Sequence, residues 1–193
     1  RGTGPRGVLD PGEILDALRL VKDAWEVERL RAAAGLSVEA QRAAAAAIRP
    51  GAGEWEVQAA LEAVLRRGSG SGPGYETIVG SGPNACVLHY VANRRVIGEG
   101  DAVLVDAGAE VGLYQGDITR TYPSGEAFSR HQRALYDVVE AARASAVAAV
   151  APGATVDAVH RAAVPAIVEG LLELGILDGS AEDLAEQEAY RPY

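Results

Sequence analysis

The sequence predicts an α+β fold in which a pair of helices precedes the strands that the helices cover. Apolar residues recur with helical spacing over residues 23–48 and 54–67, and strand-like segments follow between residues 75 and 123. The same order then begins again, because the tract RPGAGEWEV (49–57) has a counterpart in APGATVDAV (151–159). We therefore expect one helix–helix–sheet unit followed by the helices of a second unit.

The composition is that of a folded protein, with 48% hydrophobic and 23% charged residues. A net charge of −9 argues against binding to nucleic acid or to an anionic membrane. The sequence has no apolar run of the roughly 20 residues that span a bilayer, no signal-peptide pattern, and a single cysteine, Cys86. We therefore expect a cytoplasmic protein. Because the chain contains no methionine, we expect it to be a piece of a longer protein.

Local signals divide the first half of the chain into a linker and two helices. Residues 1–20 begin with many glycines and prolines and are expected to form a linker, which leaves 21–193 as the folded part. A helix is expected from about Asp23, which forms a capping box with Glu26, to Ile48 before Pro50-Gly51. Its apolar stripe is expected to comprise Val27, Leu30, Ala34, Ala44 and Ile48. The second helix is expected over 54–67.

The second half begins with strands and ends with helices. Residues 75–79 and 86–91 are strand-like and flank the turn-forming residues 81–84. After a hairpin at 101–123, a capping box of Ser129 and Gln132 predicts a helix to about residue 150. A further helix is expected over 155–174, with a kink or an early break at Pro165. A short helix is expected over 180–188.

The stretch 101–123, DAVLVDAGAEVGLYQGDITRTYP, predicts a hairpin that carries one acid in each strand. If the chain reverses near Val111 and Gly112, Asp106 lies directly opposite Asp117. Directly paired side chains have Cβ atoms about 5 Å apart, and two carboxylates so close repel unless one is protonated or a cation binds. The spacing thus permits two interpretations: a site for one or two divalent metal ions, or acids that cap strand ends or pair with arginine.

Two further residues could act with these acids. Thr119 falls on the same face as Asp117, so its hydroxyl could brace a carboxylate or a metal-bound water, although strand propensity alone also explains a threonine there. His89, in the apolar sequence LHY, is either a satisfied core residue or a hydrogen-bond donor and proton shuttle that faces the acid pair. Cys86 has no base near it in the sequence, and no phosphate-binding, dinucleotide or zinc motif is present.

These residues carry a resemblance to a known family. Residues 78–123, IVGSGPNACVLHYVANRRVIGEGDAVLVDAGAEVGLYQGDITRTYP, resemble the first half of the metallopeptidase domain of Xaa-Pro aminopeptidases (aminopeptidase P). These enzymes belong to the pita-bread-fold family, which also includes prolidase, methionine aminopeptidase and creatinase. The segments 18–34 and 186–193 resemble the same domain, so the resemblance covers nearly the whole chain from about Leu15.

The resemblance implies a pita-bread fold, of which this chain contains the first αα-β repeat and the helices of the second. It implies a dinuclear site, usually with manganese, in which Asp106 chelates one metal ion and Asp117 bridges both. It also places His89 in the active site, where it contacts the substrate or the metal-bound water. In the family, a bridging hydroxide attacks the peptide carbonyl before proline, so the resemblance implies a proline-containing peptide as the substrate. The full-length protein is expected to be a homo-oligomer.

The chain also departs from the family pattern. One histidine and two glutamates that complete the metal site, and the family's general acid/base glutamate, are expected beyond residue 193. The amino-terminal domain of aminopeptidase P is expected before the linker 1–20, so residues 21–193 are the first part of the catalytic domain. We therefore expect residues 1–193 alone to be inactive.

Two other functions stay open. Prolidase would cleave Xaa-Pro dipeptides with the same metal site. A non-catalytic pita-bread protein would be a binding module, but such relatives commonly lose the hairpin acids, which this chain retains.

Overall fold

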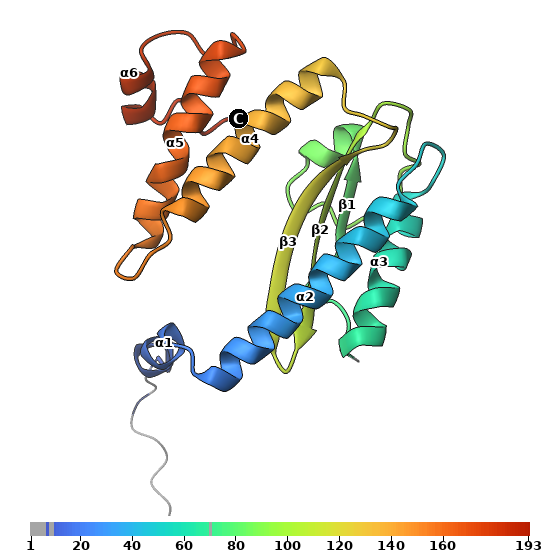
Figure 1. The fold of residues 1–193 in the computed structure, drawn as a ribbon, viewed down its shortest axis with the longest axis vertical. Helices are drawn as coiled ribbons and strands as arrows, with labels where there is room; N and C mark the ends of the chain where they lie inside the picture. Colours follow the sequence, from blue (N-terminus) through green and yellow to red (C-terminus); the bar gives the residue numbers. More distant parts are fainter. Residues whose placement is uncertain (1–6, 8–9, 70) are drawn as a thin grey trace, which may run out of the picture. The chain divides into compact units, whose positions relative to one another are not determined.

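The computed structural model describes residues 7, 10–69 and 71–193, and Figure 1 shows its elements. The chain forms two compact units, Arg1–Gly125 and Glu126–Tyr193. The first contains α1 (Gly12–Leu20), α2 (Ala24–Ala47), α3 (Glu54–Ser69), β1 (Ile78–Ser81), the 3₁₀ helix η1 (Gly82–Cys86), β2 (Ala102–Val111) and β3 (Tyr114–Pro123). The second contains α4 (Arg130–Ala148), α5 (Val156–Glu173) and α6 (Ala181–Glu186). The order confirms the α+β class. Within the described ranges, no helix is long and apolar enough to cross a membrane.

The two helix pairs begin and turn in the same way. Both predicted capping boxes are present, one on Asp23 before α2 and one on Ser129 before α4. The loops between the paired helices contain Gly51 with φ 85° and Gly153 with φ 86°. This left-handed conformation, which favours glycine, occurs within each loop, after the preceding helix has ended. The shared geometry agrees with the repeat that the two Pro-Gly tracts predict.

The sheet of the first unit is antiparallel, with strands in the order β1-β2-β3. The helices α2 and α3 pack on one of its faces (Figure 1). Side chains on β2 alternate between the two faces, so every second residue enters the core beneath these helices. The buried residues of this core include Val57, Leu61, Leu65, Val79, Val103, Val105, Ala107 and Ala109. The opposite face is left for residues such as Asp106.

The helix α2 contacts the sheet through small and polar residues. Of the predicted apolar stripe only Ala44 is buried, and the other buried residues are Ala33, Ser37, Ala40 and Gln41. The prediction failed because it selected large apolar side chains, whereas close approach to the sheet requires small ones. A Cβ added at Gly116 would lie 2.6 Å from the carbonyl carbon of Ala33, so helix and strand nearly touch there.

Polar side chains of α2 hold both strands of the hairpin. The Ser37 hydroxyl accepts a hydrogen bond from Ala109 N at 2.8 Å and lies 2.6 Å from Gly116 O, which it can donate to. Gln41 Nε2 donates to Ile118 O at 2.7 Å. Both side chains are buried, so their bonds are shielded from water.

Three sequence predictions differ from the structure. The strand predicted at 86–91 is absent, and an irregular loop follows η1, because His89 and Asn93 have φ of 53° and 44°. The short helix α1 lies within the segment expected to be a linker. The helix α5 continues through Pro165, so the early break is absent, while the alternative of a kink at Pro165 stays a prediction. Burial of Val168 and Leu171 beyond the proline offsets its cost, which is typically about 3 kcal/mol.

One buried charge joins α3 to the loop between β1 and β2. Glu54 is fully buried. Its Oε1 accepts hydrogen bonds from Ser81 N (2.8 Å), Ser81 Oγ (2.7 Å) and Asn84 Nδ2 (3.2 Å). Its Oε2 accepts from Tyr90 OH (2.8 Å) and Arg95 N (2.9 Å). Burial by itself raises the pKa of Glu54, but the hydrogen bonds from Arg95, Ser81 and Tyr90 outweigh it and hold that pKa below its usual range.

The contact between Gly116 and Ala33 predicts a steric effect of substitution. We expect Gly116→Ala to lower the free energy of unfolding by about 1–3 kcal/mol, because the new methyl group would meet the α2 backbone. Gly35→Ala is the control: it lies on α2 with nothing within 4 Å of the added Cβ, and should raise stability by about 0.5–1 kcal/mol. Urea unfolding measures both, and equal effects would contradict the packing argument.

The lowered pKa of Glu54 predicts how stability depends on pH. The unfolded chain binds the proton more tightly than the folded one, so this carboxylate stabilises the fold above its unfolded pKa of about 4.3. That contribution is lost as the pH falls through the lower, folded pKa. In Glu54→Gln, the side-chain NH2 group would face the N–H and O–H donors that now bond to a carboxylate oxygen. This variant should therefore unfold at a lower temperature than the parent at about pH 7. The difference in thermal midpoint should shrink toward about pH 3, and a difference that grows in acid would contradict this.

Candidate active site

The hairpin places Asp106 and Asp117 on the same face of the sheet, but in a register that differs from the predicted one. Asp106 lies opposite Thr119, and Asp117 lies opposite Gly108. The direct pairing of the two acids is therefore wrong by two residues, because the chain turns at Gly112-Leu113, with φ of 59° and 71°. A shift of two residues preserves the face of every side chain. The acids thus remain diagonal neighbours.

The hydroxyl of Tyr75 joins the two acids. It lies 2.7 Å from Asp106 Oδ1 and 2.9 Å from Asp117 Oδ1. Both carboxylate oxygens therefore lie within hydrogen-bonding distance of one atom. Asp106 is half-buried, whereas Asp117 is exposed.

The segment before β1 brings Tyr75 to this position. Gly74 N donates to Gly108 O at 2.9 Å, and Pro73 forms an isolated bridge with Ala109, so the chain runs along β2 before β1 begins. A Cβ at Gly108 would lie 3.0 Å from Tyr75 Cε1 and 2.4 Å from Gly116 O. A glycine is required there because a Cβ would meet the backbone carbonyl of Gly116 first and the Tyr75 ring next.

The electrostatics of this cluster favour a cation. A hydroxyl carries one hydrogen, so Tyr75 supplies one donor for two carboxylates. Burial, and then the hydrogen bonds and charges of Asp106 and Asp117, raise the pKa of Tyr75 above its usual range, so the phenol stays protonated. Two carboxylates that converge on one point are suitable ligands for a hard divalent ion. Among the described residues, no group of three or more His, Cys, Asp or Glu side chains could hold a metal ion.

The structure places Thr119 on the face predicted for it. It lies directly opposite Asp106 on the neighbouring strand, and thus on the same face as both acids. Its hydroxyl is therefore on the correct side of the sheet to contact a carboxylate.

His89 lies on the irregular loop between η1 and β2. Its side chain is exposed, so the interpretation of His89 as a core residue is wrong. Its φ of 53° is uncommon for a residue other than glycine. Within the described part of the chain, no hydrogen bond or ion pair connects His89 to Asp106 or Asp117. The nearby Cys86 is also exposed.

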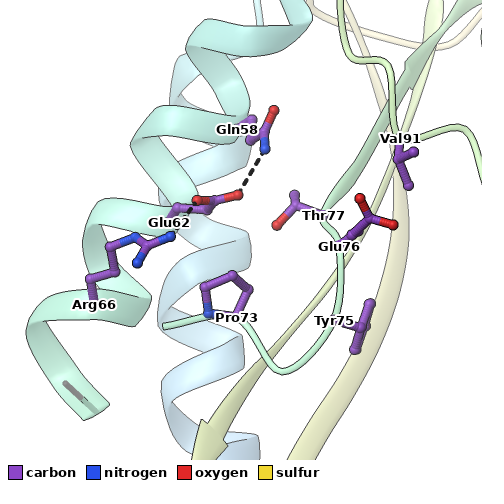
Figure 2. A pocket seen from close by; sticks show the side chains of 8 residues that line it. All are labelled: Gln58, Glu62, Arg66, Pro73, Tyr75, Glu76, Thr77 and Val91. Atoms are coloured by element: carbon purple, nitrogen blue, oxygen red, sulfur yellow. Dashed lines mark hydrogen bonds and ion pairs between the residues drawn. The ribbon is translucent and has the colours of Figure 1, made fainter. Parts of the chain in front are cut away.

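A pocket of about 300 Å³ lies between α3 and residues 73–77 (Figure 2). Figure 2 shows Gln58 and Glu62 on its helical side, where Gln58 Nε2 donates to Glu62 Oε1 at 2.8 Å. The pocket is lined by Gln58, Glu62, Arg66, Pro73, Tyr75, Glu76, Thr77 and Val91. Tyr75 lines the pocket and also contacts the acid pair, so the two features meet at this side chain.

Sequence analysis missed Tyr75 and Glu54. Tyr75 follows a glycine-rich tract and is predicted to begin a strand, and no local pattern links it to acids so far along the chain. Glu54 stands at the start of α3, where an acid is ordinarily explained by the helix dipole. Its burial is not predictable from that position.

Comparisons with known proteins identify the family of this chain. Residues 28–189 match metallopeptidase family M24. The Xaa-Pro aminopeptidase of Escherichia coli (strain K12) is 37% identical over 191 residues, which is 99% of this chain and 43% of that protein. The Xaa-Pro aminopeptidase of Haemophilus influenzae is 36% identical over 186 residues, which is 96% of this chain and 43% of that protein.

Solved structures give the same result. The chain superimposes on proline aminopeptidase P II from Yersinia pestis with a TM-score of 0.94 and 40% identity, over 98% of this chain and 43% of that one. Aminopeptidase PepP from Pseudomonas aeruginosa gives a TM-score of 0.91 and 41% identity, over 94% of this chain and 41% of that one. The pita-bread fold is thereby confirmed, and this chain spans about 43% of the length of the curated relatives. It belongs to metallopeptidase family M24.

Proposed function

We propose that this chain is the first part of the catalytic domain of an Xaa-Pro aminopeptidase, which releases the N-terminal residue from peptides with proline in second position. The observation that carries this proposal is the convergence of Asp106 and Asp117 on the Tyr75 hydroxyl, in a chain of family M24. The relatives named above as Xaa-Pro aminopeptidases support the substrate class. The cytoplasmic location and homo-oligomeric state that we expect for the whole protein belong to the same proposal.

We propose that the acid pair helps to hold two divalent metal ions and that the metal is manganese. Asp106 would chelate one ion and Asp117 would bridge both, since the two carboxylates share one face and one donor. When bound, the ions supply a Lewis acid for the scissile carbonyl and activate a water. A histidine and two glutamates, which the family resemblance implies, would come from the part of the relatives that this chain does not span.

The side chains of this chain have separate proposed roles around those ions. Tyr75 stays protonated and holds both carboxylates toward one point. Thr119, opposite Asp106, braces the carboxylate face. His89 is exposed and can donate a hydrogen bond to the substrate or accept a proton there.

Replacing the bridging acid tests the metal site. In the whole protein with added Mn²⁺, we expect Asp117→Asn to reduce release of the first residue from an Xaa-Pro-Yaa tripeptide by more than about 100-fold. The fold should survive, because the substitution removes a repulsion between unshielded carboxylates. Product release, Mn²⁺ titration calorimetry and thermal unfolding measure the three effects.

The matched control is Asp137→Asn on the exposed surface of α4, which should keep both activity and metal binding. Residues 1–193 alone should be inactive on the same peptide. Full activity of Asp117→Asn would refute the bridging role. Cleavage restricted to an Xaa-Pro dipeptide would favour the prolidase alternative.

A further inference from the structure

The loop that carries His89 has no strand to hold it. Between η1 and β2 the chain is irregular, and His89 is exposed. An active-site side chain on a loop needs other contacts to fix its position, because catalysis is sensitive to small displacements. The contacts on both sides of His89 therefore decide whether the loop is fixed.

The Glu54 carboxylate contacts the loop before and after His89. Asn84 lies on the amino-terminal side, and Tyr90 and Arg95 lie on the carboxyl-terminal side. Among the described residues, every hydrogen-bond donor to this carboxylate lies between Ser81 and Arg95. Glu54 itself is fully buried at the first turn of α3, so it is a rigid reference point for the loop.

Tyr90, which follows His89 directly, closes the loop through its hydroxyl. That hydroxyl donates to Glu54 Oε2 at 2.8 Å and accepts from Asn84 Nδ2 at 2.8 Å and from Arg94 N at 3.3 Å. One phenol oxygen thus joins residues on both sides of His89 to the buried acid.

A second anchor follows at Asn93, which is only 2% exposed. Its Oδ1 accepts from Val79 N at 2.9 Å, and its Nδ2 donates to Thr77 O at 2.7 Å and to Gln58 Oε1 at 2.9 Å. Asparagine tolerates the left-handed backbone found here, with φ 44°. The loop after His89 is therefore fixed to the edge of β1 and to α3.

We propose that Glu54 and Tyr90 are positioning residues for the peptidase reaction: through its hydrogen bond to Tyr90, the buried carboxylate fixes the backbone at His89 and hence the place of the imidazole. The inference rests on the proposed function. The left-handed conformation of His89 is one that persists only where surrounding contacts determine it.

A double-mutant cycle on the whole protein with Mn²⁺ tests this. Tyr90→Phe removes the hydroxyl but keeps the half-buried ring, so it avoids the unfolding risk of changing Glu54. We expect kcat on an Xaa-Pro-Yaa tripeptide to fall about tenfold, with KM changed less than about twofold. In a His89→Ala background, the same substitution should change kcat less than about twofold, because its effect acts through His89.

The control is Tyr114→Phe, which removes another tyrosine–carboxylate bond, from Tyr114 OH to Glu26 Oε1 at 2.6 Å. It should leave kcat unchanged. Independent, multiplicative losses from Tyr90→Phe and His89→Ala, or full kcat in Tyr90→Phe, would overturn the positioning role while leaving the proposed function intact. Absence of Xaa-Pro hydrolysis by the unmodified whole protein would overturn both.

Discussion

The register of the β2–β3 hairpin is the constraint on which the candidate site depends. Because side chains alternate along a strand, a slip of one residue would place Asp106 and Asp117 on opposite faces of the sheet. The tight turn at Gly112-Leu113 sets this register. Ser37 and Gln41 of α2 hold it from the other face, since both bond to the hairpin backbone. The position of the acids thus depends on a helix that packs on the opposite face of the sheet.

Two glycines allow this sheet to be contacted closely on both faces. At Gly116 the absence of a Cβ leaves room for the backbone of α2. Gly108 precedes the residue that pairs with Gly116, and its missing Cβ leaves room for the ring of Tyr75 on the other face. Asp117 lies next to Gly116 and opposite Gly108. The hairpin is therefore held from both faces at the acid that we propose to bridge the metals, which restricts its motion where precise geometry matters most.

The sequence was informative where a short stretch of chain decides the structure. Neighbouring residues decide the capping boxes at Asp23 and Ser129, the Pro-Gly turns and the hairpin. The predicted register was wrong by two residues, but the prediction that the two acids share one face of the sheet was still correct. The segment 86–91 was different. Its apolar composition is typical of a strand, but the segment is irregular, and Tyr90 within it is bonded to the distant Glu54. Tyr75 was missed for the same reason, since only the fold brings it to the acids.

The two long helices of the first unit divide the support of the site between them. The helix α2 holds the hairpin through Ser37 and Gln41, and α3 holds the His89 loop through Glu54 and Gln58, which reaches the loop at Asn93. Because β1 and β2 are paired, the relative position of loop and hairpin follows from how both helices pack on one sheet. Substitutions buried beneath either helix can therefore displace one part of the site without touching the other. Loss of activity from such a core substitution does not require loss of the fold.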